Sequence, residues 1–195
     1  MSITIHHGLP AQLRGDAARL YWQAFGGKLG RVLGPEPLAF ALLNRVMRSD
    51  HAIVALSDQG ALLGLVGFKS PEGAFAGGGF ADLHSVYGIT GAIWRAGLLW
   101  LLERDMDNDR FLMDGICVAD GARGQGVGTA LLEAIYAEGR RRGYASVRLD
   151  VIDTNARARA LYERQGFRPT RTSQIGLLRL VFGFSAATTM VRPLP

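Results

Sequence analysis

The fold is decided by residues 118–129, which read Val-Ala-Asp-Gly-Ala-Arg-Gly-Gln-Gly-Val-Gly-Thr. An apolar run before this stretch predicts a buried strand, and helical spacing after it predicts a helix from about Gln125 to Arg142. Glycines at alternate positions let a ligand approach the backbone closely. The first N–H groups of the helix lack partners within it and favour an anion. Because Arg123 adds a planar donor for phosphate, the stretch predicts a diphosphate site.

Other glycine-rich loops fit this stretch less well. A dinucleotide fingerprint needs G-x-G-x-x-G, but Gly128 follows Gly126 one residue early. A P-loop ends in Gly-Lys-Ser/Thr, and these residues contain no lysine. The structural alternative is a turn that only packs a helix on a strand. The alternate glycines after Arg123 disfavour that alternative.

The rest of the chain predicts an α/β fold. Its patterns indicate strands at 3–5, 51–56, 62–68, 110–118, 145–152, 167–172 and 188–192, and helices at 10–25, 35–48, 89–102, 125–142 and 155–165. Hairpin residues Ser57–Gly60 join two strands, so we expect a mixed sheet of about seven strands flanked by helices. A glycine-rich loop is expected at 26–34. The apolar segment 175–184 has no clear type.

Residues 70–109 interrupt this pattern as a helical insertion before the fourth predicted strand. The segment 89–102 predicts an apolar helix with Trp94 and Trp100, and 105–109 predicts a polar turn. This helix is compatible with four roles: completing the core, covering an acceptor cleft, forming a dimer contact or touching a membrane surface. If the helix covers an acceptor cleft, three residues in or just before it would line the acceptor site, namely His84, Tyr87 and Arg95.

Composition narrows the class of protein. The chain has 195 residues, 48% hydrophobic and 20% charged, which excludes a disordered chain and fits one domain over 1–195. A single cysteine, Cys117, excludes a disulfide framework and a Cys-rich zinc site, so we expect no metal. The net charge of +5 favours an anionic partner, but the charges form no patch interleaved with aromatics, so nucleic acid is not expected. We also expect neither a leader peptide nor a membrane span, and a cytoplasmic location.

Two blocks of this sequence resemble the GNAT superfamily of N-acetyltransferases. The family's acetyl-CoA loop, R/Q-x-x-G-x-G/A, matches Arg123-Gly124-Gln125-Gly126-Val127-Gly128. Its block N-x-x-A-x-x-L-Y-x-x-x-G-F is similar to the stretch from Asn155 to Phe167, after a strand that contains Leu149-Asp150-Val151. The similarity is strong over about 113–168, and the segments 70–109 and 175–184 depart from it. The resemblance implies a cofactor-binding core at about 110–168 and a V-shaped opening between the strands ending near Val118 and Ile152.

The resemblance also implies how this opening is used. Acetyl-CoA would lie in it, with the diphosphate on backbone N–H groups of 125–129 and the pantetheine arm along the backbone of 116–118. The expected cofactor-binding residues are Ile116, Cys117, Val118, Arg123, Gly124, Gln125, Gly126, Val127, Gly128, Thr129, Asn155 and Tyr162. Asn155 and Tyr162 are seven positions apart, so they face the same side of their helix. The structural alternatives are a helix N-cap for Asn155 and a core aromatic for Tyr162.

Three residues are candidates for proton transfer. Tyr162, with an ordinary pKa near 10, would protonate the departing thiolate, whose thiol has a pKa of about 8.5. Asp150 is the first candidate for the general base, because some protein N-terminal acetyltransferases of the family carry a catalytic carboxylate at the corresponding strand position. Asp114 is the second, because strand alternation places it on the face of Ile116 and Val118. Either carboxylate is also compatible with a purely structural role. Cys117 is disfavoured as a nucleophile, since no histidine accompanies it in sequence.

The sequence therefore predicts an N-acetyltransferase that moves an acetyl group from acetyl-CoA to a primary amine. Direct attack in a ternary complex is the expected route, and the amine belongs to a small molecule, a peptide or a protein. The alternative is a module that binds acetyl-CoA as a sensor without catalysis. A homodimer is compatible with the sequence. Acceptor, acyl length and oligomeric state stay open.

Overall fold

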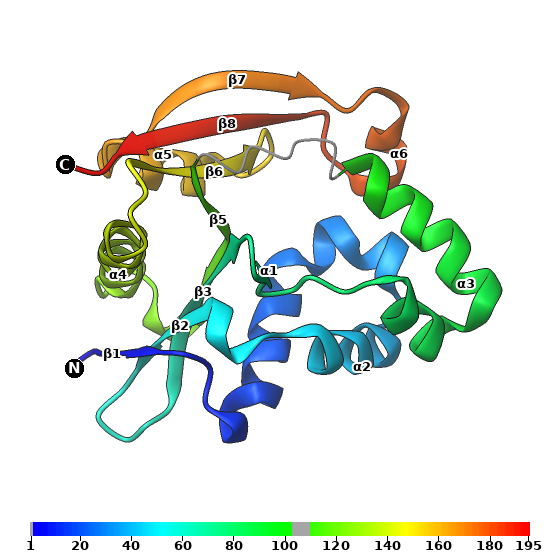
Figure 1. Cartoon of the computed structure of the whole chain (residues 1–195), viewed down its shortest axis with the longest axis horizontal. Helices are drawn as coiled ribbons and strands as arrows, with labels where there is room; N and C mark the ends of the chain where they lie inside the picture. Colours follow the sequence, from blue (N-terminus) through cyan, green and yellow to red (C-terminus); the bar gives the residue numbers. More distant parts are fainter. Residues whose placement is uncertain (1, 103–109) are drawn as a thin grey trace.

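The computed structural model, which describes residues 2–102 and 110–195, contains one mixed sheet (Figure 1). Its order is β1-β2-β3-β5-β6-β8-β7, and β4 pairs with β3. The strands are β1 (Thr4–His7), β2 (Ala52–Leu56), β3 (Leu62–Ser70), β4 (Gly73–Ala74), β5 (Phe111–Val118), β6 (Ser146–Ile152), β7 (Arg168–Gln174) and β8 (Ala186–Pro193). Among the strand pairs of the described residues, β5–β6 alone is parallel. The predicted mixed sheet is confirmed, with the short β4 added. The polar turn predicted at 105–109 lies outside the described residues.

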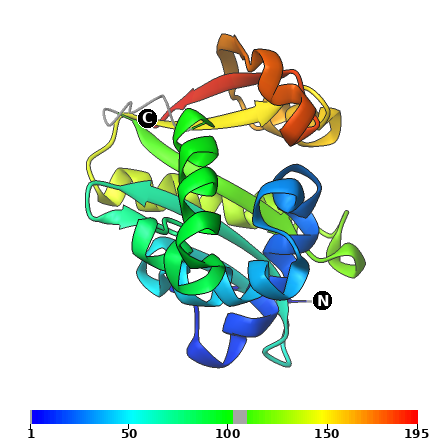
Figure 2. The same ribbon diagram turned by 90° about the vertical axis from the view of Figure 1, so that its right-hand side faces the viewer.

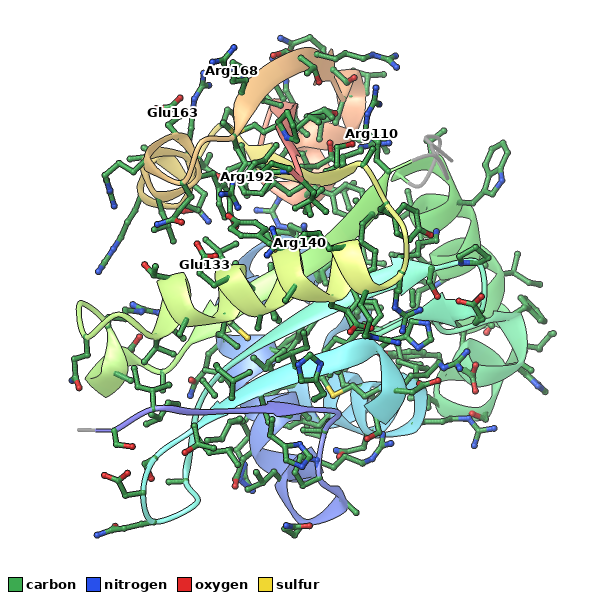
Figure 3. The ribbon with its side chains drawn as sticks, turned by 60° about the vertical axis from the view of Figure 1, so that its left-hand side comes forward. Arg110, Glu133, Arg140, Glu163, Arg168 and Arg192 are labelled. Carbon is green, nitrogen blue, oxygen red and sulfur yellow. The ribbon has the colours of Figure 1, made fainter. Side chains whose placement is uncertain are left out.

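Helices cover both faces of the sheet. They are α1 (Arg14–Leu33), α2 (Glu36–Val46), α3 (Phe80–Leu102), α4 (Val127–Arg141), α5 (Ala156–Arg164) and α6 (Arg179–Phe182), with short 3₁₀ turns at 11–13, 49–51, 120–122 and 176–178. Figures 1 and 2 show α1, α2 and α3 on one side and α4 on the other. In Figure 3, α4 lies along its face of the sheet, and Arg192 of β8 reaches toward it. The Arg192 guanidinium lies 3.7 Å from the centroid of the Tyr136 ring on α4.

The sheet opens where β5 and β6 diverge. Their ladder contains two register pairs, Phe111 with Val147 and Leu112 with Arg148. Beyond these pairs β5 runs on to Val118 beside β3, while β6 runs on to Ile152 beside β8. The predicted V-shaped opening therefore exists, and its two edges carry backbone groups that no β5–β6 ladder uses.

A bulge in β5 corrects the predicted placement of Asp114. Gly67 pairs with Gly115 and Phe68 pairs with Met113, so Asp114 is an extra residue between them. Met113 and Ile116 consequently pack in the same core cluster, although strict alternation would put them on opposite faces. Alternation through this point therefore does not place Asp114 with Ile116 and Val118.

The loop predicted at 26–34 is wrong, because α1 continues through it to Leu33. Val32 and Leu33 are 0% and 5% exposed, in a cluster with α2, α3 and α6. Burying such side chains contributes about 1.5–3 kcal/mol each. This offsets the helix cost of glycine, about 1 kcal/mol each. Gly26 also makes room for Trp22, whose ring would lie 3.1 Å from a Cβ there.

The insertion forms a broken helix. Its predicted part, 89–102, is helical, and α3 also extends back to Phe80 through a break at Gly88, where φ is 68°. The unassigned segment 175–184 contains a 3₁₀ turn and α6. Within 2–102 and 110–195, none of the helices has the length and apolar character that crossing a membrane needs.

Candidate active site

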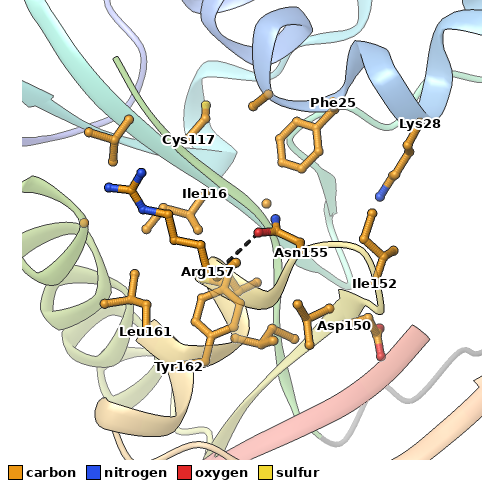
Figure 4. A pocket seen from close by; sticks show the side chains of 18 of the residues that line it. Phe25, Lys28, Ile116, Cys117, Asp150, Ile152, Asn155, Arg157, Leu161 and Tyr162 are labelled. Carbon is orange, nitrogen blue, oxygen red and sulfur yellow. Dashed lines mark hydrogen bonds between the residues drawn. The ribbon is translucent and has the colours of Figure 1, made fainter. Parts of the chain in front are cut away.

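A cavity of about 860 Å³ occupies the opening between β5 and β6 (Figure 4). Residues of α1 form one wall, and residues of α5 form the wall opposite. The glycine loop and the first turn of α4 also line it, and α6 and its C-cap contribute Phe182 and Gly183. The sheet, the glycine loop and four helices therefore meet at one cavity.

The glycine loop presents bare backbone to this cavity. Gly124 and Gly126 have φ values of 78° and 85°, and a Cβ on either would meet no atom within 4 Å. The first helical hydrogen bond of α4 runs from Ala130 N–H to the Gly126 carbonyl, at 2.9 Å. The N–H groups of 127–129 consequently have no acceptor within the helix. Such an end fits a diphosphate, because its donors and its dipole favour negative charge.

Two of the expected cofactor-binding residues do not line the cavity. Gln125 donates a hydrogen bond from Nε2 to the Gly121 carbonyl at 2.7 Å, and Val127 is 1% exposed in the core. Any contact from Val127 to a ligand would therefore come from its backbone. Arg123 does line the cavity and forms an ion pair with Asp120 at 2.6 Å. The other expected residues also line it, namely Ile116, Cys117, Val118, Gly124, Gly126, Gly128, Thr129, Asn155 and Tyr162.

The edge of β5 supplies a second kind of binding surface. Its residues 116–118 pair with Val66, Leu65 and Gly64 of β3 on one side. On the other side the ladder to β6 has already ended. An extended ligand with amide groups fits this edge, because main-chain donors and acceptors there can pair with it as a strand would. Arg123 Nε also donates to the Val118 carbonyl at 3.4 Å.

On α5, Asn155 and Tyr162 line the same wall (Figure 4). Asn155 is the N-cap, since its Oδ1 accepts a hydrogen bond from Ala158 N–H at 3.1 Å. Tyr162 is 6% exposed, and its ring meets Phe167 edge-on with centroids 5.8 Å apart. Burial raises the pKa of Tyr162 well above its ordinary value, and the neighbouring Tyr136 and Cys117 add to this. Tyr162 therefore keeps its proton at neutral pH.

The buried Cys117 lines the cavity without being activated. Burial raises the pKa of its thiol to about 12, and a hydrogen bond from the backbone of Leu65 offsets this only in part. The thiolate is the nucleophilic form of cysteine. A nucleophilic role for Cys117 is therefore disfavoured by its surroundings as well as by the sequence.

The two carboxylate candidates also line the cavity, in different settings. Asp150 accepts hydrogen bonds from Thr189 Oγ1 at 2.5 Å and from Arg148 Nη2 at 3.2 Å. Thr189 stands directly opposite Asp150 in the β6–β8 ladder. Asp114 lies at the bulge, and its charge contributes to raising the pKa of Tyr21 on α1.

Residues of α1 complete the cavity, and the sequence reasoning missed them, Phe25 and Lys28 in particular. Phe25 and Lys28 line its wall, facing α5 (Figure 4). The Phe25 ring packs where Gly115 has no side chain, since a Cβ there would come within 2.7 Å of it. The signal was the spacing of Tyr21, Phe25 and Lys28 at i, i+4 and i+7, which the predicted loop at 26–34 obscured.

The three acceptor-site candidates near the insertion do not line the cavity. Tyr87 donates to the Leu33 carbonyl at 2.6 Å, and Arg95 donates to the carbonyls of Gly91 and Gly34. These bonds tie α3 to the end of α1. His84 stacks on Phe80, with ring centroids 6.4 Å apart.

Comparisons with known proteins agree with this architecture. The model of the acetyltransferase (GNAT) family matches residues 16–167. A mycothiol acetyltransferase of Beutenbergia cavernae is 39% identical over 85 residues, covering 37% of this chain and 29% of that protein. The chain thus spans less than a third of the length of that relative.

Two solved structures show the same fold. An N-acetyltransferase from Staphylococcus aureus Mu50 has a TM-score of 0.70 at 15% identity, covering 97% of this chain and 100% of that one. A putative streptothricin acetyltransferase from Bacillus anthracis, solved in complex with acetyl coenzyme A, has a TM-score of 0.51 at 14% identity. The match covers 74% of this chain and 62% of that one. The family match extends over most of the described chain and includes the glycine loop and α5. The chain therefore belongs to the acetyltransferase (GNAT) family.

Proposed function

We propose that this protein is an N-acetyltransferase that transfers an acetyl group from acetyl-CoA to a primary amine within a ternary complex. The observation that carries the proposal is the meeting of an open β5 edge with the bare N-terminus of α4 in one cavity. The first suits a chain of amides and the second suits a diphosphate. Coenzyme A contains both.

The residues that would hold the donor follow from these surfaces. Backbone N–H groups at the start of α4, together with Arg123, would hold the diphosphate. The backbone of 116–118 would pair with the pantetheine arm. Acetyl-CoA supplies the acetyl group as a thioester, and its transfer forms the amide C–N bond while the C–S bond breaks.

Tyr162 is suited to deliver a proton to the leaving sulfur. It lines the cavity on the wall formed by α5, and its phenol is protonated at neutral pH. Burial also makes the phenol a weaker acid, so the raised pKa itself does not favour the transfer. A thiolate left without a proton is the stronger nucleophile toward the new amide, so its protonation favours the forward reaction. This is the role proposed for Tyr162.

A carboxylate would receive the proton of the acceptor amine. Asp150 stays the first candidate and Asp114 the second. Hydrogen bonds from Thr189 and Arg148 fix the carboxylate of Asp150 in place. At pH 7, deprotonation costs about 1.4 kcal/mol for an α-amine with a pKa near 8 and about 4.6 for a lysine-like amine.

The test combines binding with turnover. Titration calorimetry measures acetyl-CoA binding, and a thiol reagent follows CoA release over a panel of amines that includes N-terminal and lysine peptides. Binding together with acceptor-dependent release supports the proposal. Binding without release from any amine would favour the sensor alternative, and failure to bind would contradict the assignment of the glycine loop.

A further inference from the structure

Lys28 is a cation of the cavity that donor binding does not explain. Its side chain points from α1 into the cavity (Figure 4). Among the described residues its ammonium makes no hydrogen bond or ion pair, and it lies near the Phe25 ring, with 5.4 Å from Nζ to the centroid. Burial lowers the pKa of this lysine, and the charges of Asp114 and Asp150 oppose that shift. A half-buried ammonium with unused donors calls for an anionic partner.

The proposed diphosphate site is at the N-terminus of α4 and does not include Lys28. Figure 4 shows Arg157 and Lys28 on opposite sides of the cavity, with α4 on the side of Arg157. Lys28 instead stands with the two carboxylates that line the cavity, since both influence its charge. The group that it binds must therefore reach this end with the acceptor.

The charges around Lys28 form a set that a zwitterion complements. Asp114, Asp150 and Lys28 line the same cavity, the charges of both carboxylates act on Lys28, and Asp150 is also paired with Arg148. An ammonium group is attracted to the carboxylates, and a neighbouring anionic group is attracted to Lys28. A neutral amine would leave the ammonium of Lys28 desolvated without a partner, at a cost to binding.

We propose that the acceptor is a small amine with a compact anionic group, a carboxylate or a phosphate, close to the reacting nitrogen, and that Lys28 binds this group. The inference rests on the proposed function and adds the class of acceptor. It makes Lys28 a specificity-determining residue. Because the surfaces proposed to bind the donor do not include Lys28, we expect its replacement to change acceptor recognition and to leave donor binding intact.

The experiment compares matched acceptors with four proteins. The carboxylate arm uses glycine and β-alanine against their amides, and the phosphate arm uses 2-aminoethyl phosphate against ethanolamine. The proteins are wild type, K28M, K28R and K69M, since Lys69 is the other lysine of the chain and lies outside the cavity. Initial rates are compared at equal concentrations of unprotonated amine. Acetyl-CoA affinity and thermal stability are measured for every variant.

In the wild type we expect at least one anionic acceptor to exceed its neutral partner in kcat/KM by about tenfold or more. K28M should remove this preference by raising KM for the anionic acceptor, while KM for the neutral one stays equal or falls because no ammonium is left desolvated. K28R should keep part of the preference, K69M all of it, and acetyl-CoA affinity should stay within about twofold throughout. The arm that shows the preference identifies the carboxylate or the phosphate.

Several results would overturn the inference. One is equal or better turnover of neutral amines by the wild type, and another is a loss in K28M that is the same for every acceptor. Bound acetyl-CoA without turnover of any anionic acceptor also counts against it. In these cases acetyl-CoA binding and CoA release with other amines still test the proposed function independently. Failure of the wild type to bind acetyl-CoA would instead overturn the proposed function itself.

Discussion

Replacing Gly126 by alanine tests the binding role of the glycine loop. Gly126 has a φ of 85°, and an added Cβ would meet no protein atom within 4 Å, so the methyl group would enter the cavity. The backbone cost of a non-glycine residue in this conformation is about 1–2 kcal/mol. In the presence of a ligand the methyl group would also block the approach of an anion to the N–H groups that follow.

The size of the effect follows from the hydrogen bonds that the methyl group would prevent. A hydrogen bond to a charged group contributes about 1.5–3 kcal/mol. Loss of one such bond raises the Kd for CoA by about tenfold to a hundredfold. For a chain of this length, the backbone cost alone lowers Tm by about 2–8 °C.

Gly60 provides a matched control. Its φ is 76°, a Cβ there would also meet nothing within 4 Å, and it lies in the hairpin between β2 and β3 away from the cavity. G60A and G126A should therefore lose similar stability in thermal denaturation. In titration calorimetry with CoA and acetyl-CoA, only G126A should lose affinity. If both variants bind CoA as the wild type does, the backbone of the loop does not contact the donor.

Three further predictions concern other groups. Tyr162→Phe should lower kcat by about a hundredfold, as expected for loss of a general acid, with acetyl-CoA affinity nearly unchanged, and equal losses in both would contradict the acid role. Cys117 is 5% exposed and the pKa of its thiol is raised to about 12. At pH 7 this thiol should therefore react with a thiol reagent far more slowly in the native protein than after unfolding. Hydrogen bonds from Arg141 lower the pKa of Glu138 to about 2; burial opposes this shift and hydrogen bonds from Arg142 add to it. The stability that the Glu138 carboxylate contributes is therefore complete above about pH 5 and is lost as the pH falls toward 2. The shift corresponds to at most about 3 kcal/mol, which screening at the exposed Arg141 reduces to about 1–2, and urea unfolding at pH 6 and pH 3 should show this loss in the wild type but not in Glu138→Gln.

The features that the sequence predicted correctly depend on short stretches of chain. The glycine loop, the helix after it and the N-cap at Asn155 each depend on backbone conformation over a few neighbouring residues, which composition and spacing reveal. The hairpin at Ser57–Gly60 is of the same kind. The element order, the mixed sheet and the position of Tyr162 followed from these local patterns.

The part of the cavity in which we propose that the acceptor binds depended on contacts between distant parts of the chain. Packing of Val32 and Leu33 against other helices extends α1 through its glycines and brings Lys28 to the cavity wall. Pairing with β3 creates the bulge that displaces Asp114, and Thr189 of β8 holds Asp150. Burial then raises the pKa of Tyr162 and of Cys117. The sequence alone was enough to place the glycine loop and the helix cap that we propose bind the donor, because loop and cap conformations are local. The surroundings of the proposed acceptor site came from the three-dimensional structure, because they arise from packing and pairing that no short window of sequence contains.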